Sequence, residues 1–369
     1  MPTRFRAYRT KLLVNDKESS HLLGCAGLAR FAYNWGLAAW QKEYEAGGTP
    51  NAWAITKQFN AIKGEQFPWV TEYPSTITKA ALDHLGRAFQ NFFRRVKQGE
   101  TPGYPKFKSR HRTTPSFTVS QSIHVEEGRV KLPRIGWLRL AEKGYLPTCG
   151  VKILSANISH RGGDWYIALQ VEEEVADPPP PTGPPIGIDL GVKSLAVVSD
   201  GTVFDNPRTL AHYEKRLARL QREYSRRQKG SSNREKTRQK IAALHRKIAD
   251  VRSHTLHDIS RHVTANTKPV TVVLENLDVK AMLQTSYLAK QVSDAALGEL
   301  KRQITYKAEW NGIRVVEAER EFPSSKTCSN CGHVVDSLSL SKRIFVCPGC
   351  GVRLDRDLNA ALNLVTLAG

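Results

Sequence analysis

The sequence predicts a multidomain α/β protein, and three observations carry this prediction. A block of helical periodicity interrupts a first part that otherwise alternates apolar and polar residues, as strands do. The proline-rich stretch "ADPPPPTGPP", residues 176–185, separates this part from a second one in which strand and helix patterns alternate. Two Cys-x-x-Cys pairs near the end of the chain have the spacing of a metal-binding module. A chain of 369 residues is long enough for two or three domains.

The first part begins with residues 1–15, which read as a basic strand. Apolar residues then recur every three or four positions, which predicts a first long helix that ends at a Gly-Gly-Thr-Pro stretch. Further helices are predicted over 52–63 and 75–97, the second with Ser75 as its candidate N-cap. The three helices are expected to form one small bundle within residues 16–102.

From residue 103 the pattern changes to short alternating stretches joined by glycine-containing turns, which predicts β-strands up to about residue 178. Together with residues 1–15 they should form a small β-barrel or sandwich. The helical bundle is then an insertion after the first strand. Residues 179–185 form a stiff linker, because consecutive prolines fit neither a helix nor a central strand.

The second part opens with "IGIDLGVKSLAVVSDGTVF", which predicts three antiparallel strands joined by tight turns. A helical pair follows over residues 208–262, where 16 Lys plus Arg stand against 5 acids, a net charge of 16 − 5 = +11. A buried strand ending at Glu275, a helix over Asp294–Trp310 and a strand in "GIRVVEAE" come next. The cysteine module and a short final helix close the chain.

The charge of the whole chain points to a polyanionic partner. Fifty-five Lys plus Arg against 35 Asp plus Glu give a net charge of +20 and an isoelectric point near 9.8. Nucleic acid is the natural ligand for such an excess. The sequence has no signal-peptide pattern and no uninterrupted apolar run of the ~18 residues that a membrane span needs. We therefore expect a cytoplasmic, nucleoid-associated protein without a membrane partner.

Four cysteines indicate a structural zinc site. Cys328 and Cys331 are separated by fifteen residues from Cys347 and Cys350, a spacing by which two knuckles present four thiolates to one Zn²⁺. Two disulfides are the first alternative, and a reducing compartment disfavours them. A redox-active Cys-x-x-Cys motif is the second alternative, but such a motif would not require a second Cys-x-x-Cys pair.

Three carboxylates are candidates for a second metal site, namely Asp189, Glu275 and Asp357. Taken singly, each also fits a structural role, and Asp355 or Asp357 could cap the final helix. Taken together, they follow the order in which the ribonuclease H fold brings carboxylates into one cluster. Such a cluster can hold two Mg²⁺ about 4 Å apart, which activate a water and stabilise the leaving oxygen of a phosphodiester.

Several stretches resemble the TnpB (OrfB) family of insertion-sequence proteins, which is related to the type V CRISPR effector nucleases. They include "GIDLG", "VVLENLDVK", "FPSSKTCSNCG" and "CPGCGVRLDRDLNAALNL", and upstream "LARFAYNWGL", "YPKFKSRHR" and "GRVKLPRIGWLRL". The resemblance implies an RNA-guided DNA endonuclease of a transposable element. Its RuvC-type site would consist of Asp189, Glu275 and Asp357, each a ligand of Mg²⁺, with Asp355 as a helix cap.

The resemblance also implies a domain organisation and partners. The expected domains are a wedge barrel (1–15 and 103–178), a helical recognition domain (16–102), a RuvC-like nuclease (186–322 and 353–369) and an inserted zinc ribbon (323–352). One protein of prokaryotic type would bind one guide RNA derived from the transposon end. It would make double-strand breaks in target DNA next to a short target-adjacent motif, both strands being cut by one site.

Ten residues are expected to contact nucleic acid. By the resemblance, the target-adjacent motif would be read by the start of the third helix and by the barrel, which indicates Ser75, Thr76 and Lys79, with Trp53, Ser120 and Gln121. Basic residues interleaved with aromatic ones are candidates for contacts to the nucleic-acid backbone: Lys106, Lys108, Arg110 and Arg112.

Two other functions are compatible with parts of this pattern. A nuclease-inactive, RNA-guided DNA-binding transcriptional regulator would keep the fold without cutting, and the three intact carboxylates weigh against it. A guide-independent nuclease or recombination accessory factor would need no RNA. The upstream resemblance to wedge and recognition segments weighs against that alternative.

Overall fold

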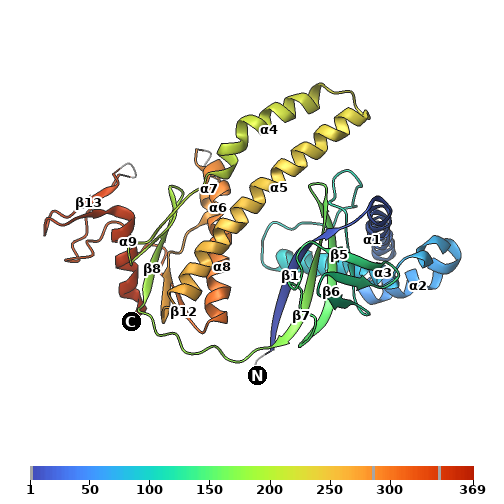
Figure 1. Cartoon of the computed structure of the whole chain (residues 1–369), viewed down its shortest axis with the longest axis horizontal. Coiled ribbons are helices and arrows are strands. Elements are labelled where there is room, and N and C mark those ends of the chain that lie inside the picture. The colour runs from blue at the N-terminus through green and yellow to red at the C-terminus, as the bar shows by residue number, and fades with distance from the viewer. Residues whose placement is uncertain (1–2, 285–286, 340–341) are drawn as a thin grey trace. The chain divides into compact units, whose positions relative to one another are not determined.

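The computed structural model describes residues 3–284, 287–339 and 342–369, and the chain divides into two compact units after Ala176. Figure 1 labels the helices and several of the strands of both units. The proline-rich stretch follows this division directly. Among the described residues, no helix is long and apolar enough to cross a membrane.

The first unit contains the predicted helical bundle. Its helices are α1 (Asp16–Glu45), α2 (Ala52–Gln66) and α3 (Ser75–Lys97), with a 3₁₀ turn η1 (Pro68–Glu72) before the last. A capping box starts α1, since the Asn15 side chain accepts from the Glu18 N–H and the Glu18 carboxylate accepts from the Asn15 N–H. The prediction of Ser75 as a cap is wrong, because Pro74 occupies the N-cap position and Ser75 is the first helical residue.

A single antiparallel sheet makes up the rest of the first unit. Its seven strands lie in the order β2-β6-β7-β1-β5-β4-β3. Because β1 precedes the helices and the other strands follow them, the bundle is an insertion after the first strand, as predicted. The strands form one continuous sheet rather than two separate sheets, and its end strands β2 and β3 are not paired with each other, so among the described strands the sheet is not a closed barrel. The strand bounds are β1 (Thr3–Leu13), β2 (Ser116–Val119), β3 (His124–Glu126), β4 (Arg129–Leu132), β5 (Gly136–Leu140), β6 (Val151–Arg161) and β7 (Asp164–Glu174).

The second unit is built on a mixed sheet with the order β10-β9-β8-β11-β12. The predicted meander is present as β8 (Ile186–Leu190), β9 (Ser194–Val198) and β10 (Val203–Asp205). Two later strands, β11 (Thr271–Leu274) and β12 (Arg314–Glu317), run parallel to β8. Every residue of β11 is buried, as expected for a strand at the centre of an α/β sheet.

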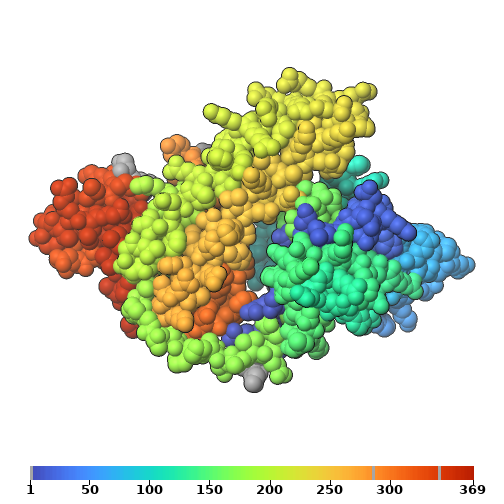
Figure 2. All heavy atoms as spheres, viewed as in Figure 1, coloured from blue at the N-terminus to red at the C-terminus, as the bar shows by residue number. Residues whose placement is uncertain are grey.

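Between β10 and β11 the chain forms the predicted helical pair, α4 (Thr209–Arg226) and α5 (Ser232–Arg261). The two helices pack through an apolar seam that includes Leu217, Leu220, Leu244 and Ile248. In Figure 2 the side chains of this basic hairpin form a continuous ridge that extends from its unit.

Helices α6 (Val279–Gln284), α7 (Ala289–Ala295) and α8 (Leu297–Trp310) follow β11. The prediction of one helix over Asp294–Trp310 is wrong, because the chain turns at Ala296, where φ is +52°. Within α7, the carboxylate of Asp294 accepts hydrogen bonds from the Leu210 N–H at 2.9 Å and from Arg252 at 2.7 Å. Asp294 therefore ties α7 to the base of the α4–α5 hairpin.

The chain closes with a small hairpin, β13 (Ile344–Val346) and β14 (Arg353–Asp355), and with helix α9 (Arg356–Val365). Helix α9 packs against β8, and Gly187, the first glycine of "GIDLG", makes this possible. A Cβ on Gly187 would lie 2.1 Å from the carbonyl oxygen of Ala361 and 2.8 Å from the Leu364 Cβ. The C-terminal half of α9 can therefore pack this closely on β8 only because position 187 lacks a side chain.

Candidate active site and cysteine cluster

Two of the predicted carboxylates meet at one edge of the mixed sheet. Asp189 lies in β8 and Glu275 directly follows β11, and the register pairs Leu274 with Ile188. Because parallel strands end at the same edge, the residues that follow this pair are neighbours. The carboxyl groups of Asp189 and Glu275 share a hydrogen bond.

The third carboxylate, Asp357, comes from the first turn of α9. Asp355 is the N-cap of this helix, as predicted, and its carboxylate accepts from the N–H groups of Asp357 and Leu358 at 2.9 and 3.1 Å. The charge of Asp357 acts on the other two acids. Three elements far apart in the sequence thus place Asp189, Glu275 and Asp357 within electrostatic range of one another.

Two arginines, which the sequence analysis did not select, accompany Asp357. Arg356 lies 3.2 Å from one oxygen of the Asp357 carboxylate, and Arg343 lies 3.5 Å from the other. Arg356 lies between the two aspartates of "DRD", so the sequence alone could have indicated that it is near the site. Arg343 comes from the cysteine module, and only the folded structure connects it to the site.

The electrostatics of the cluster favour a cation. Burial raises the pKa of Asp189 well above its ordinary value, and the charges of Glu275 and Asp357 raise it further. Burial also raises the pKa of Glu275, whereas a hydrogen bond from Ser324 lowers this pKa. The negative charges of neighbouring carboxylates repel one another, and a bound cation would relieve this repulsion. Carboxylate oxygens are also the ligands that hard divalent cations prefer.

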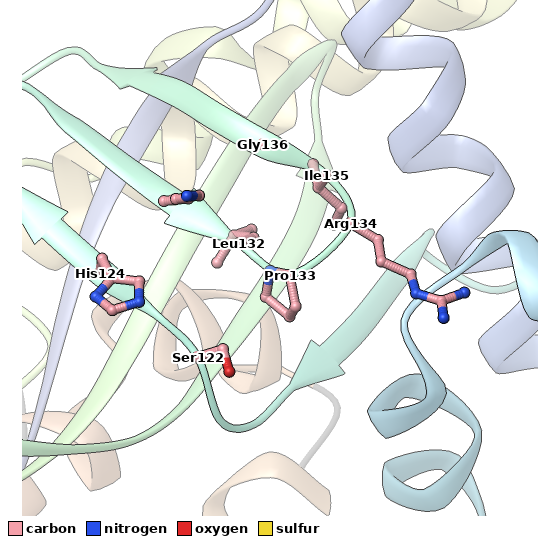
Figure 3. Close-up of a pocket in the computed structure, with 8 residues that line it drawn as sticks. Ser122, His124, Leu132, Pro133, Arg134, Ile135 and Gly136 are labelled. Carbon is pink, nitrogen blue, oxygen red and sulfur yellow. The ribbon is translucent and has the colours of Figure 1, made fainter.

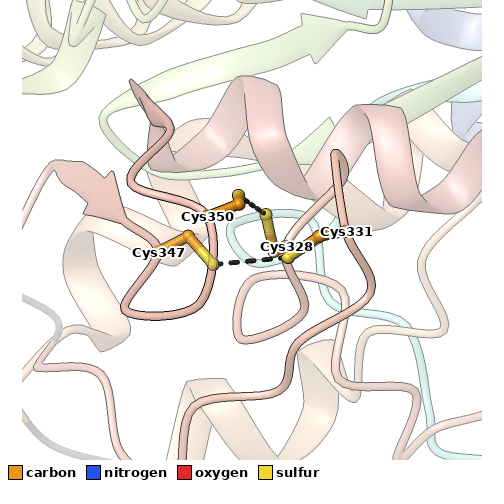
Figure 4. A group of neighbouring side chains, drawn as sticks. All are labelled: Cys328, Cys331, Cys347 and Cys350. Atoms are coloured by element: carbon orange, nitrogen blue, oxygen red, sulfur yellow. Dashed lines mark hydrogen bonds between the residues drawn. The ribbon is translucent and has the colours of Figure 1, made fainter.

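The four cysteines also converge, and their sulfur atoms all lie within 4.8 Å of one another. Figure 4 shows Cys328 opposite Cys350, at 3.7 Å, and Cys331 opposite Cys347, at 3.5 Å. These separations are far longer than the ~2.05 Å of an S–S bond, so the structure contains no disulfide among them. Four thiols around one point form a donor set for a tetrahedral metal ion.

Hydrogen bonds join the cysteine module to the carboxylate cluster. The Asn359 amide accepts from the Ser329 N–H at 2.9 Å and donates to the Thr327 carbonyl at 2.7 Å. Asn363 donates to the Ser324 carbonyl at 2.7 Å, and the Ser324 hydroxyl donates to Glu275 at 2.7 Å. Asn359 and Asn363 are buried, so α9 holds the loop that enters the module. Neither these asparagines nor Ser324 was predicted from the sequence as part of a site.

The residues predicted to contact nucleic acid all lie in the first unit. Most present exposed side chains: Trp53, Ser75, Lys79, Lys106, Arg110, Arg112 and Gln121, whereas Thr76 and Ser120 are partly buried. Lys108 differs, because its ammonium lies 3.8 Å from the centroid of the Tyr33 ring and burial lowers its pKa. Its backbone also exchanges two hydrogen bonds with the Asn34 amide, so this segment is docked on α1.

Three protein families match parts of the chain. Residues 168–286 match the family OrfB_IS605, described as "Probable transposase". Residues 298–364, which include the cysteine module and α9, match the family described as "Cas12f1-like, TNB domain". Residues 1–49 match the "Helix-turn-helix domain" of OrfB proteins, although here this stretch forms one strand and one long helix.

Curated relatives align along nearly the whole chain. A Streptomyces pristinaespiralis protein named as an RNA-guided DNA endonuclease is 34% identical, over 98% of this chain and 88% of the relative. The Escherichia coli K12 protein InsQ, named in the same way, is 31% identical over 98% of this chain and 92% of its own. A solved Cas12f1–sgRNA–target DNA complex shares the fold, with a TM-score of 0.59 at 15% identity over 99% of this chain and 98% of that chain.

Proposed function

Because the chain belongs to the TnpB (OrfB) family of RNA-guided DNA endonucleases, we propose that it is the endonuclease of an insertion sequence. It cuts double-stranded DNA that is complementary to a bound guide RNA and lies next to a short target-adjacent motif. The observation that carries this function is the convergence of Asp189, Glu275 and Asp357 from three separate elements.

The carboxylates are proposed to hold two catalytic Mg²⁺, which would supply an activated water and stabilise the leaving oxygen of the phosphodiester. Asp189 and Glu275 offer oxygens from the sheet edge, and Asp357 offers one from α9. Burial makes the ionised acids costly without a cation, which favours metal binding at neutral pH. Ser324 orients Glu275, and Arg343 and Arg356 balance the charge of Asp357.

The remaining domain assignments extend this proposal. The strand order of the second unit supports a ribonuclease H-like, RuvC-type nuclease over 186–322 and 353–369. The four converging thiols support a structural Zn²⁺ in a ribbon over 323–352. In the first unit, the sheet (1–15 and 103–178) would act as wedge and the bundle (16–102) as recognition domain, with 179–185 as the linker.

The proposed partners are one guide RNA, derived from the transposon end, and the target duplex. The excess positive charge of the chain supports binding of a polyanion, whose sequence would be read by base pairing rather than by side chains. The nuclease-inactive regulator is disfavoured, because all three carboxylates are present and grouped.

Purification of the protein together with its RNA tests the proposed function. The RNA is sequenced, and a plasmid that carries its complement beside a randomised flanking segment is incubated with the complex and Mg²⁺. Wild type should linearise a subset of plasmids that share one flanking motif, and Asp189→Ala should linearise none. Cutting by protein without RNA would refute guidance, and no cutting by wild type on any flanking segment would favour the regulator.

A further inference from the structure

Reactive side chains outside the three acids gather at the cysteine cluster rather than at the hollow of the first unit. The hollow measures about 470 Å³ and lies at the β4–β5 turn (Figure 3). Its described lining includes Ser122, His124 and Lys131 but neither a thiol nor a carboxylate. The cysteine cluster brings four thiols within 4.8 Å of one another. Thiols this close can be converted reversibly to disulfides, so the cluster is a candidate site of oxidation.

Each close sulfur pair in the cluster joins one exposed and one buried cysteine. Cys350 is exposed, and its sulfur lies 3.7 Å from that of the buried Cys328. Cys331 is exposed, and its sulfur lies 3.5 Å from that of the buried Cys347. Both pairs can be followed in Figure 4. An oxidant in solution therefore meets one thiol of each pair, and a second thiol lies next to it.

Four residues before each buried cysteine, the chain contacts one of the three acids. Ser324 precedes Cys328 by four positions, and its hydroxyl donates to Glu275 at 2.7 Å. Arg343 precedes Cys347 by four positions, and its guanidinium lies 3.5 Å from the Asp357 carboxylate. A displacement of either buried cysteine is thus passed to an acid through a short segment of chain.

The buried cysteines are also part of the small core of the cysteine module. Among the described residues, this core consists of the buried side chains of Cys328, Phe345 and Cys347, with partly buried apolar residues around them. An S–S bond shortens a sulfur separation of 3.5 or 3.7 Å to about 2.05 Å. Oxidation therefore moves two of the three buried core side chains, and a close-packed core transmits such a shift to its surroundings.

Helix α9 is fastened to the segment that contains Cys328. Both neighbours of Cys328 bind the Asn359 amide, which contacts the Thr327 carbonyl at 2.7 Å and the Ser329 N–H at 2.9 Å. The same helix carries Asp357 in its first turn. A shift of Cys328 is therefore transmitted to Asp357 through α9 as well as along the chain.

We propose that the pairs Cys328–Cys350 and Cys331–Cys347 are sites at which a peroxide reversibly switches DNA cleavage off. The exposed thiol of each pair attacks one oxygen of hydrogen peroxide, the O–O bond breaks, and a sulfenic acid and one water result. The buried thiol then attacks the sulfenic sulfur, so that an S–S bond forms and the hydroxyl group leaves with a proton as a second water. Each pair gives up two electrons, which reduce one peroxide to two waters.

Oxidation has two consequences for the module. Four sulfurs in two disulfides no longer offer the thiolates that would hold Zn²⁺, so the ion is released. The shifted core also withdraws Ser324 from Glu275 and Arg343 from Asp357. A dithiol reductant reverses the oxidation, because disulfides exchange with thiolates. The effect on cleavage rests on the proposed function, whereas the oxidation itself does not.

Peroxide treatment of the purified protein–RNA complex tests the oxidation sites. Cys149→Ser is used throughout, because this exposed cysteine lies outside the cluster and would react separately. A chromogenic chelator measures released zinc, and mass spectrometry of unreduced peptides locates the disulfides. We expect release of about one Zn²⁺ per chain together with disulfides Cys328–Cys350 and Cys331–Cys347. Reduced cysteines that keep the zinc, disulfides within each Cys-x-x-Cys pair, or sulfonic acids in place of disulfides would overturn the proposal.

Cleavage of a guided plasmid by the same samples measures the switch. The rate should fall at least roughly tenfold, the effect of losing one hydrogen bond to an ionised group, with the time course of zinc release. Dithiothreitol together with Zn²⁺ should restore the rate. Unchanged cleavage after full oxidation, a loss that this treatment does not reverse, or release of the RNA with the same time course would each contradict a switch that acts on the acids.

Failure of this proposal is distinguishable from failure of the proposed function, because the zinc and disulfide measurements require no cleavage. If the reduced complex cuts no DNA, the proposed function fails, and the rise in melting temperature with Mg²⁺ replaces cleavage as the measure of the acids. That rise should be present in the reduced protein and absent in the oxidised protein, and an equal rise in both would overturn the switch. If the reduced complex cuts guided DNA and its cysteines resist peroxide, the oxidation sites fail alone.

Discussion

At the scale of single residues, the acid cluster is a place where function opposes stability. Asp189, Glu275 and Asp357 crowd negative charge at a partly buried sheet edge. Folding therefore raises the pKa of Asp189, with burial as the main cause. In the absence of a cation, the ionised site should weaken the fold that presents it.

Asp189→Asn tests this cost. The unfolded chain loses the Asp189 proton near pH 4 and the folded chain only at higher pH, so the metal-free protein loses stability as the pH rises between these values. At pH 7.5 without divalent metal, the variant should melt about 2–5 °C higher than wild type, and the difference should vanish near pH 4. Mg²⁺ should raise the melting temperature of wild type only. A variant that melts lower at pH 7.5 would contradict the charge argument.

Ser324→Ala tests the hydrogen bond that orients Glu275. A hydrogen bond to an ionised group contributes about 1.5–3 kcal/mol, so the cleavage rate should fall roughly 10- to 150-fold, measured with saturating RNA and Mg²⁺. Ser325→Ala is the matched control at the neighbouring position and should cut at the wild-type rate. Equal rates for the two variants would show that Ser324 does not position Glu275.

At the scale of elements, local pattern predicted much of the fold. The meander, the buried strand before Glu275 and the α4–α5 pair follow from apolar periodicity and turn residues. Features that depend on distant partners were missed. The helix expected over Asp294–Trp310 is interrupted at Ala296, Asp294 binds Leu210 and Arg252, and Lys108 packs on Tyr33. No local periodicity encodes such contacts.

The same distinction applies to the candidate site. Asp189 and Glu275 could be predicted from the sequence, because each lies near the end of an apolar strand pattern and the two follow the order expected for the fold. Arg343 and Ser324 could not, since both reach the site from the cysteine module through folding alone. Through these contacts, the cysteine module that precedes α9 supplies partners to two of the three acids.

Gly187→Ala tests the approach of α9 to β8. The added Cβ would collide with the Ala361 carbonyl and force α9 away from the sheet, which should cost about 1–3 kcal/mol of unfolding free energy and abolish cleavage. Gly298→Ala is the matched control, because a Cβ there meets no atom within 4 Å and a helical alanine is favoured by about 0.5–1 kcal/mol. Chemical denaturation measures both. Wild-type stability and cleavage in Gly187→Ala would show that the close approach is unnecessary.

Cys347→Ser tests the metal assigned to the cysteine cluster. Loss of one thiolate should release the zinc, so metal analysis should fall from about one Zn²⁺ per chain to near zero, with increased proteolysis of the C-terminal region. Cys149→Ser, at an exposed cysteine outside the cluster, should keep the metal. One Zn²⁺ retained in Cys347→Ser would show that the ligand set is wrong.

At the scale of the whole molecule, one chain is proposed to perform two tasks. A bound RNA would select the DNA sequence, and the single carboxylate cluster would hydrolyse both strands. The positive charge that would bind nucleic acid is concentrated in one region, since over half of the net +20 lies on residues 208–262.

Reprogramming of the guide tests whether the bound RNA selects the DNA that is cut. The targeting segment of the copurified RNA is replaced by one that matches a second site on the same plasmid, beside the same flanking motif, and the cut ends are sequenced. Both cut strands should map to the second site with wild type, and Asp189→Ala should leave both strands intact. Cuts that remain at the first site, or strand cleavage by Asp189→Ala, would contradict the account.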